Sequence, residues 1–262
     1  GALGVGSTEM RETPRRLHYH RRFFSLRLAN ARDLIVWLPP NYDKEIERRY
    51  PVIYVHDGQN LFDPATAFAG VDWQLGKTAD SLISAGKVDP MIIVGIANTP
   101  ARLEEYSPAK GRDYAAFLID EVKPFIDRTY RTLPQYQHTA VMGSSLGGLI
   151  SFYLAWWHPQ VFSMAGCLSA TWMWENSAAI RMVDQESSTP PDIKIYLDHG
   201  SEGGEGRQAW IYRSMRDALL KRGFKLGKNL AYYFGVGDEH NETAWGRRIE
   251  RPLIFFFGKH RC

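Results

Sequence analysis

The sequence predicts an α/β fold with a mainly parallel central sheet and helices on both of its faces. Short apolar runs rich in Val and Ile alternate with longer amphipathic stretches over most of the chain. This alternation is typical of β-α-β units, whose right-handed crossovers place helices on both sides of a parallel sheet. Neither an internal repeat nor a linker rich in Pro, Gly or Ser divides the 262 residues. We therefore expect a single domain.

The expected strands and helices follow in order along the chain. Segments 23–28 and 34–38 alternate enough to form a hairpin, which Pro39 and Pro40 end. Short apolar runs predict the buried strands of the parallel sheet, at 52–55, 91–94, 139–142, 162–168, 193–197 and 230–234. The stretches between them predict helices, at 73–85, 113–128, 146–157, 207–222 and 243–256. A polar, proline-ended stretch at 184–191 indicates a surface loop.

Composition and charge limit the classes of function. A hydrophobic fraction of 44% with 13% aromatic residues suits an enzyme with a sizeable core. The net charge of +3 comes from charges of both signs spread along the chain, whereas nucleic-acid binding usually needs basic residues clustered on one face. No run reaches the roughly 18 apolar residues of a membrane helix. We expect neither a nucleic-acid nor a membrane partner, and these features leave the oligomeric state open.

The chain ends and the two cysteines carry little functional signal. Residues 1–20 are expected to be a loose N-terminal segment or an expression remnant, and residues 21–262 the domain. Cys167 lies in an apolar run and is expected in the core, while Cys262 is the last residue. These positions favour neither a disulfide framework nor a zinc site. The compartment stays open: soluble, and either cytoplasmic or secreted with a leader removed.

The strongest local motif is Gly143-Ser144-Ser145-Leu146-Gly147, which matches G-x-S-x-G. An expected strand precedes it and an expected helix follows it, the context in which this motif forms a nucleophile elbow of the α/β-hydrolase fold. The tight turn needs glycines because side chains there would collide with neighbouring backbone. It projects the serine oxygen above the sheet, at a helix N-terminus that favours negative charge. Ser145 is therefore the expected nucleophile.

A serine hydroxyl needs a neighbouring base, and in this architecture the chain order is serine, acid, histidine. His240 follows the last expected strand, in a loop that can reach over the elbow, and is our candidate for the base. His56 and His199 also end strands and stay candidates for pocket residues. The remaining histidines lie in the charged N-terminal segment, at the far end of a strand, at a helix end or in the tail.

The triad acid is expected in the glycine-rich loop after strand 193–197. Its task is to hold the imidazole in one tautomer and to stabilise the imidazolium that forms. Glu202 and Glu205 are the candidates and Asp198 is a third; we favour Glu205 narrowly. Four glycines in this loop suggest that it folds tightly against the site.

An oxyanion hole needs two backbone N–H groups aimed at the developing alkoxide. Leu146, the residue after the nucleophile, supplies one by the geometry of the elbow. The other is expected from the loop after strand 52–55, where Gln59 is the candidate donor through its backbone.

Four separated segments in the same order make the chain resemble the esterase D/putative esterase family of α/β hydrolases. They are Tyr50–Asp63, Arg102 with Glu105-Tyr106-Ser107-Pro108, Met142–Gly148, and Glu239-His240-Asn241-Glu242 with Trp245, Arg248, Pro252 and Leu253. The family includes feruloyl, acetyl-xylan and enterochelin esterases. The resemblance implies Ser145 as nucleophile, His240 as base, and Gln59 and Leu146 as oxyanion donors. Many members place the acid where this chain has Gly203, and a placement two residues later corresponds to Glu205.

The expected activity is hydrolysis of carboxylic esters through an acyl-enzyme on Ser145. Short-chain esters, carbohydrate-linked acetyl or feruloyl esters and siderophore esters are the substrates considered. Trp172 and Trp174 follow the strand that ends at Leu168 and are candidates to stack on a sugar or aromatic acid. An acyltransferase with the same triad and a non-catalytic binding module are the alternatives. No metal or organic cofactor is implied.

Overall fold

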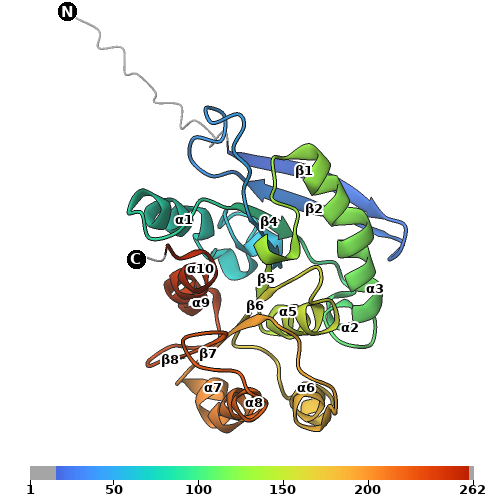
Figure 1. Cartoon of the computed structure of the whole chain (residues 1–262), viewed down its shortest axis with the longest axis vertical. Helices are drawn as coiled ribbons and strands as arrows, with labels where there is room; N and C mark the ends of the chain where they lie inside the picture. The colour runs from blue at the N-terminus through green and yellow to red at the C-terminus, as the bar shows by residue number, and fades with distance from the viewer. Residues whose placement is uncertain (1–15, 260–262) are drawn as a thin grey trace, which may run out of the picture.

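The computed structural model describes residues 16–259, and eight strands of this part form one sheet in the order β1-β2-β4-β3-β5-β6-β7-β8 (Figure 1). The strands are β1 (Leu17–Ser25), β2 (Asn30–Trp37), β3 (Val52–His56), β4 (Ile92–Ile96), β5 (Thr139–Ser144), β6 (Met164–Leu168), β7 (Lys194–Gly200) and β8 (Leu230–Gly235). Strands β3 to β8 are parallel, while β2 pairs antiparallel with both β1 and β4. This is the predicted α/β-hydrolase architecture.

The expected N-terminal boundary at residue 20 is wrong in one respect. Strand β1 begins at Leu17 and pairs with β2 from the Leu17–Trp37 register onward, so residues 17–20 belong to the sheet. The predicted hairpin also turns earlier than expected, because Ser25 ends β1 and its hydroxyl accepts a hydrogen bond from Leu28 N. Residues 1–15 and the terminal Cys262 lie outside the described residues.

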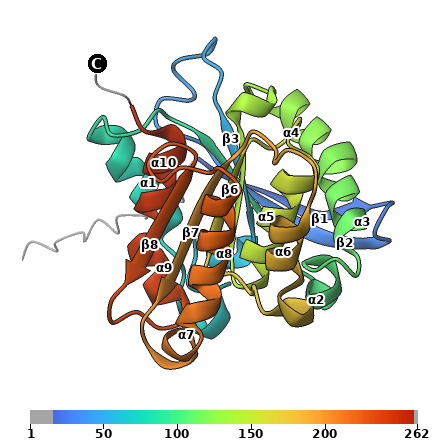
Figure 2. The ribbon, with the colours of Figure 1, turned by 60° about the horizontal axis from the view of Figure 1, so that its bottom comes forward.

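Helices cover both faces of the sheet (Figures 1 and 2). One face packs against α3 (Gly111–Ala116), a π-helical turn (Phe117–Val122), α4 (Lys123–Thr129), α5 (Leu146–Trp157), α6 (Trp174–Gln185) and α8 (Ala209–Lys221). The other face packs against α1 (Leu75–Ser84), α9 (Glu242–Arg248) and α10 (Glu250–Phe257). Two short helices, α2 (Arg102–Glu105) and α7 (Gly203–Arg207), lie in the connections after β4 and β7.

Helix α6 has no counterpart among the predicted helices. Three successive residues near its start, Glu175 to Ser177, adopt left-handed backbone angles, and only Ala179, Ile180 and Val183 are buried along it. A helix with so few apolar positions gives a weak periodic signal in the sequence. The predicted loop at 184–191 accordingly begins later, after Gln185.

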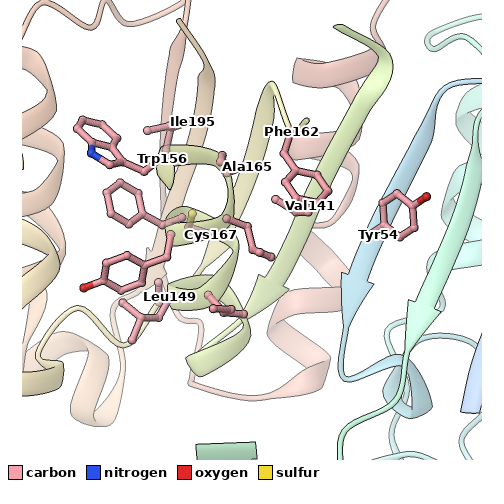
Figure 3. Packing of buried hydrophobic residues seen from close by; sticks show 14 of the residues in the cluster. Tyr54, Val141, Leu149, Trp156, Phe162, Ala165, Cys167 and Ile195 are labelled. Carbon is pink, nitrogen blue, oxygen red and sulfur yellow. The ribbon is translucent and has the colours of Figure 1, made fainter. Parts of the chain in front are cut away.

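Alternate residues of the central strands fill the larger of the two cores. Val141 on β5, Ala165 and Cys167 on β6, and Ile195 on β7 point to the face that α5 covers, where they meet Leu149 (Figure 3). These side chains are fully buried, so Cys167 is the small core residue that its apolar context predicted. The parallel strands are thereby fixed rigidly, and their carboxyl ends carry the candidate site.

Candidate active site

The turn between β5 and α5 has the geometry of a nucleophile elbow. Ser145 lies there with φ 59° and ψ −123°, a backbone conformation that residues other than glycine rarely adopt. A Cβ at Gly143 would lie 2.6 Å from backbone atoms of Gly147, so the glycine is required for the chain to turn. Hydrogen bonds from Ser145 N to Leu168 O (2.9 Å) and from Thr171 N to Ser145 O (3.1 Å) hold the turn against the end of β6.

His240 reaches the serine from the loop between β8 and α9. Its Nε2 lies 3.1 Å from Ser145 Oγ, at hydrogen-bond distance. Asn241 caps α9 by accepting a hydrogen bond from Ala244 N at 3.0 Å, which fixes the loop next to the imidazole. The edge of Trp245 packs against the imidazole with ring centroids 4.9 Å apart. Ser145 Oγ also lies 3.3 Å from Thr171 Oγ1.

Glu205, of the three candidate acids, faces the imidazole. Its Oε2 lies 3.8 Å from His240 Nδ1, and its side chain is only 2% exposed. Glu202, three residues earlier, is exposed, and Ser201 Oγ donates to it at 3.3 Å. Asp198 is buried and paired with Arg248 at 2.9 Å, so both of its oxygens are engaged away from the imidazole. The geometry therefore separates Glu205 from the other two carboxylates.

Close packing of two loops brings Glu205 and His240 together. A Cβ at Gly200, where β7 ends, would lie 2.1 Å from Asp238 O in the loop that carries His240. Glu202 N donates to the same Asp238 oxygen at 3.0 Å, and Ser201 Oγ accepts from Gly237 N at 2.7 Å. The glycines of the first loop thus allow the contact that the sequence suggested.

The electrostatic surroundings favour a neutral His240. Burial lowers the pKa of His240 below 6.5, and the charges of Arg248 and Arg102 act in the same direction. The carboxylate of Glu205 opposes them by stabilising the protonated form. A neutral imidazole can accept the serine proton at neutral pH, which is the state that a general base needs.

The backbone next to Ser145 can bind an oxyanion. Leu146 is the first residue of α5, and the first N–H groups of a helix have no partner within it. Gln59 lies in a short 3-10 helix (Gly58–Asn60) that follows β3 and faces the same hollow as Ser145. Asp57 starts this turn with φ 58° and ψ 48°. The Gln59 side chain is occupied elsewhere, because its Oε1 accepts from Asn98 N at 3.1 Å.

Two hollows open on either side of Ser145 and His240. The first has a volume of about 500 Å³ and is lined on its polar side by Asp57, Asn98 and Arg102. The second, of about 360 Å³, lies toward Thr171 and includes Met173 and Tyr212. An ester bound at the serine could therefore place its acyl and alcohol groups in different hollows.

The predicted substrate contact of Trp172 is wrong. Its side chain is 1% exposed and packs against Phe152 in the core, with the two ring centroids 5.4 Å apart. Trp174 is half-buried against the same core and lines neither hollow, so its role stays a prediction. His56 and His199 are also buried; they bond Tyr114 (2.8 Å) and Tyr232 (2.6 Å), respectively, so neither is a pocket residue.

Several residues behind the triad were not predicted as part of the site. Arg248 donates hydrogen bonds to Asp198 and to the hydroxyl of Ser169. Thr171 contacts Ser145. Arg102 and Arg248 occur in the segments that carry the family resemblance. Their position there indicated a role in the site but did not show what that role is. Nothing in the sequence around Ser169 indicates its position.

Comparison with known proteins places this geometry in a family. The profile of the esterase family described as "Putative esterase" matches residues 25–256. A protein of Bacillus subtilis strain 168 named "Uncharacterized protein YbbA" is 24% identical, over 89% of this chain and 95% of its own length. A Xylanibacter ruminicola protein named "Endo-1,4-beta-xylanase/feruloyl esterase" is 28% identical over 90% of this chain, which spans only 30% of that longer protein.

Solved structures share the fold. A structure described as a ferulic acid esterase has a TM-score of 0.75 at 21% identity and covers 92% of this chain and 97% of its own. The enterobactin esterase FES from Shigella flexneri, solved in the presence of enterobactin, has a TM-score of 0.75 at 18% identity, over 92% of this chain and 58% of its own. Within residues 16–259, no helix combines the length and apolar character needed to cross a membrane. Since the family profile spans nearly all of the described sheet, the chain belongs to this esterase family and is a carboxylic ester hydrolase with an α/β-hydrolase fold.

Proposed function

We propose that the protein is a serine esterase that works through an acyl-enzyme on Ser145. The observation that carries this proposal is the 3.1 Å contact between Ser145 Oγ and His240 Nε2, with Glu205 behind the opposite ring nitrogen. Serine hydroxyls become nucleophilic when such a base accepts their proton. The elbow supports the same assignment, since it presents the hydroxyl at the N-terminus of α5.

In the first half of the reaction, His240 accepts the Ser145 proton while Oγ attacks the ester carbonyl. The carbonyl oxygen becomes an oxyanion, and the backbone N–H groups of Leu146 and Gln59 donate to it. Glu205 stabilises the imidazolium through Nδ1–H. The imidazolium then gives its proton to the leaving alcohol, the C–O bond breaks, and an acyl-serine ester remains.

In the second half, water takes the place of the alcohol. His240 removes a proton from this water, whose oxygen attacks the acyl carbon and forms a second oxyanion at the same donors. Collapse of this intermediate returns the proton from His240 to Ser145 Oγ and releases the carboxylic acid. Each residue thus acts twice, and the enzyme ends in its starting state.

The proposed substrates are short-chain, carbohydrate-linked acetyl or feruloyl esters, or siderophore esters. One relative is named a feruloyl esterase, and two structural neighbours are named a ferulic acid esterase and an enterobactin esterase; these names support the proposed substrate classes. The two hollows fit them in size, because sites for drug-sized ligands occupy about 300–1,000 Å³. The partner is therefore a small molecule or a carbohydrate ester.

The test compares the wild type with Ser145→Ala on p-nitrophenyl acetate, acetyl-xylan, methyl ferulate and a siderophore ester. We expect Ser145→Ala to lose at least about a thousandfold in kcat on every accepted ester, since removing a triad nucleophile has effects of this size or larger. Ser214→Ala is the matched control, because its hydroxyl donates to Trp210 O within α8, and Ser214 lines neither hollow at Ser145. Undiminished turnover by a folded Ser145→Ala would refute the nucleophile, and the panel identifies the preferred ester.

A further inference from the structure

We propose that Ser169 is a positioning residue whose hydroxyl group sets the orientation of the triad carboxylate, and that Arg248 sets the orientation of that hydroxyl. The inference rests on the proposed function, because it assigns how Glu205 is held for His240. Ser169 follows β6 directly and is fully buried, although it borders the second hollow, so its hydroxyl is sealed from solvent by the partners described below. It acts through Glu205.

The direction of the Ser169 hydroxyl follows from its partners. Its Oγ contacts Arg248 Nη2 at 2.9 Å and Trp245 Nε1 at 3.1 Å. Both partners can only donate hydrogen bonds, so they occupy the two acceptor positions of the oxygen. The single hydroxyl hydrogen must then point to the third partner, which is Glu205 Oε1. The hydroxyl is thus a donor to the carboxylate, with no alternative orientation that keeps all three contacts.

This hydrogen bond determines which carboxylate oxygen is available. Oε1 of Glu205 accepts from Ser169 Oγ and also from Gly200 N at 3.1 Å. Oε2 has no hydrogen-bond partner among the described residues, although it is buried, and it faces His240 Nδ1 at 3.8 Å. A buried oxygen without a hydrogen-bond donor costs free energy, so Glu205 Oε2 favours the His240 tautomer that carries a hydrogen on Nδ1. That tautomer leaves the lone pair of Nε2 directed at Ser145.

Charge and backbone contacts hold Ser169 itself in place. Arg248 is 2% exposed and donates to both oxygens of Asp198, at 3.1 and 2.9 Å, and to Asp238 at 3.1 Å. Ser169 N donates to Asp198 Oδ1 at 3.0 Å. Ser169 also adopts a φ of 44°, an unusual conformation for serine that the surrounding contacts must maintain. Trp245 links the cluster to the base, because the same indole bonds Ser169 and packs on His240.

The test uses Ser169→Ala and Ser169→Gly, since glycine fits a positive φ without strain and so separates hydroxyl loss from backbone effects. We expect both variants to lose about 10- to 100-fold in kcat, the usual cost of removing a group that orients an active-site ligand, with KM changed less than about threefold. The downfield proton NMR signal of His240 Nδ1–H should weaken or disappear. Ser25→Ala is the matched control, because Ser25 is also buried and donates to a glutamate, Glu121, at 2.7 Å.

The outcomes separate this proposal from the proposed function. Loss of kcat and of the Nδ1–H signal in a folded Ser169→Gly, with Ser25→Ala normal, supports the positioning role. Wild-type kcat in Ser169→Gly, or a kcat loss with the Nδ1–H signal unchanged, overturns it while leaving a dead Ser145→Ala as evidence for the nucleophile. Full turnover by Ser145→Ala would instead refute the proposed function, whatever Ser169 does.

Discussion

Two arginine–carboxylate clusters flank the serine and differ in their access to water. On one side, Arg102 donates to both oxygens of Asp57, at 2.9 and 2.8 Å, and the side chain of Arg102 is 30% exposed in the first hollow. On the other side, Arg248 pairs with Asp198 and Asp238 and is 2% exposed. The two arginines therefore differ in their exposure, although the carboxylate of Asp57 is itself only 4% exposed.

The exposure of the arginine decides what each ion pair contributes to the site. A sealed ion pair has a large desolvation cost and is tolerated only when its hydrogen bonds are well satisfied, so its geometry is rigid. Arg248 meets that condition and supports Ser169 and, through it, Glu205. An arginine that reaches solvent is partly screened by water and salt, which weakens its ion pair. The Arg102 side of the site is therefore the more weakly held one and the Arg248 side the fixed one.

The largest effect should come from Glu205, the carboxylate supported by the buried cluster of Arg248, Asp198 and Asp238, called here the sealed cluster. Glu205→Gln keeps the shape but removes the charge and can hold the wrong imidazole tautomer. We expect kcat on p-nitrophenyl acetate to fall about 10³- to 10⁴-fold, as for loss of a triad carboxylate in other serine hydrolases. Steady-state kinetics measures this fall. Glu202→Gln is the matched control and should retain wild-type kcat, because Glu202 is exposed and away from His240; the opposite pattern would reverse the acid assignment.

The next effect concerns stability and compares the two clusters directly. Asp198→Asn leaves Arg248 with a reduced set of charged partners in a sealed site, and we expect the free energy of unfolding to fall by about 3 kcal/mol. Asp57→Asn should cost about 1 kcal/mol or less, because water can solvate Arg102 and asparagine tolerates the left-handed φ of 58° at this position. Urea unfolding measures both values. Equal losses would show that exposure does not distinguish the clusters.

The sequence predicted the parts of the site that local patterns specify. Ser145 is surrounded by glycines between a predicted strand and a predicted helix, and His240 follows the last apolar run. Their order in the chain therefore led to the prediction that they form a nucleophile and its base. The strand positions came from the same apolar runs, which parallel strands buried on both faces produce. Local pattern was sufficient for the elbow turn and for the positions of the strands, but not for His56 and His199, which end strands and are buried.

The sealed cluster could not be predicted because its contacts join distant segments. Arg248 lies 50 residues from Asp198 and 79 from Ser169, and no periodicity connects them. Trp172 was misassigned for a related reason, since its side chain packs against Phe152, which lies 20 residues earlier in the chain on α5. Glu205 was favoured only narrowly over Glu202, because distinguishing them requires knowing that α7 turns the first inward and leaves the second exposed.

The smallest expected effect tests the exposed cluster through the pH dependence of catalysis. His240 must be neutral to act as a base, so kcat/KM should fall as the pH drops through the pKa of His240, which burial holds below 6.5. Arg102→Gln removes a positive charge that lowers the pKa of His240. The acidic limb should therefore move to higher pH.

The size and salt dependence of that shift decide whether the effect is electrostatic. Because Arg102 is 30% exposed, we expect a small shift to higher pH at low ionic strength, which shrinks at about 0.5 M salt as the charge is screened. Profiles of kcat/KM on p-nitrophenyl acetate at both salt concentrations measure it. Arg128→Gln is the control, because Arg128 is exposed on α4 and is not among the charges that shift the pKa of His240. A shift to lower pH, or one that salt leaves unchanged, would mean that Arg102 influences His240 through packing and not through its charge.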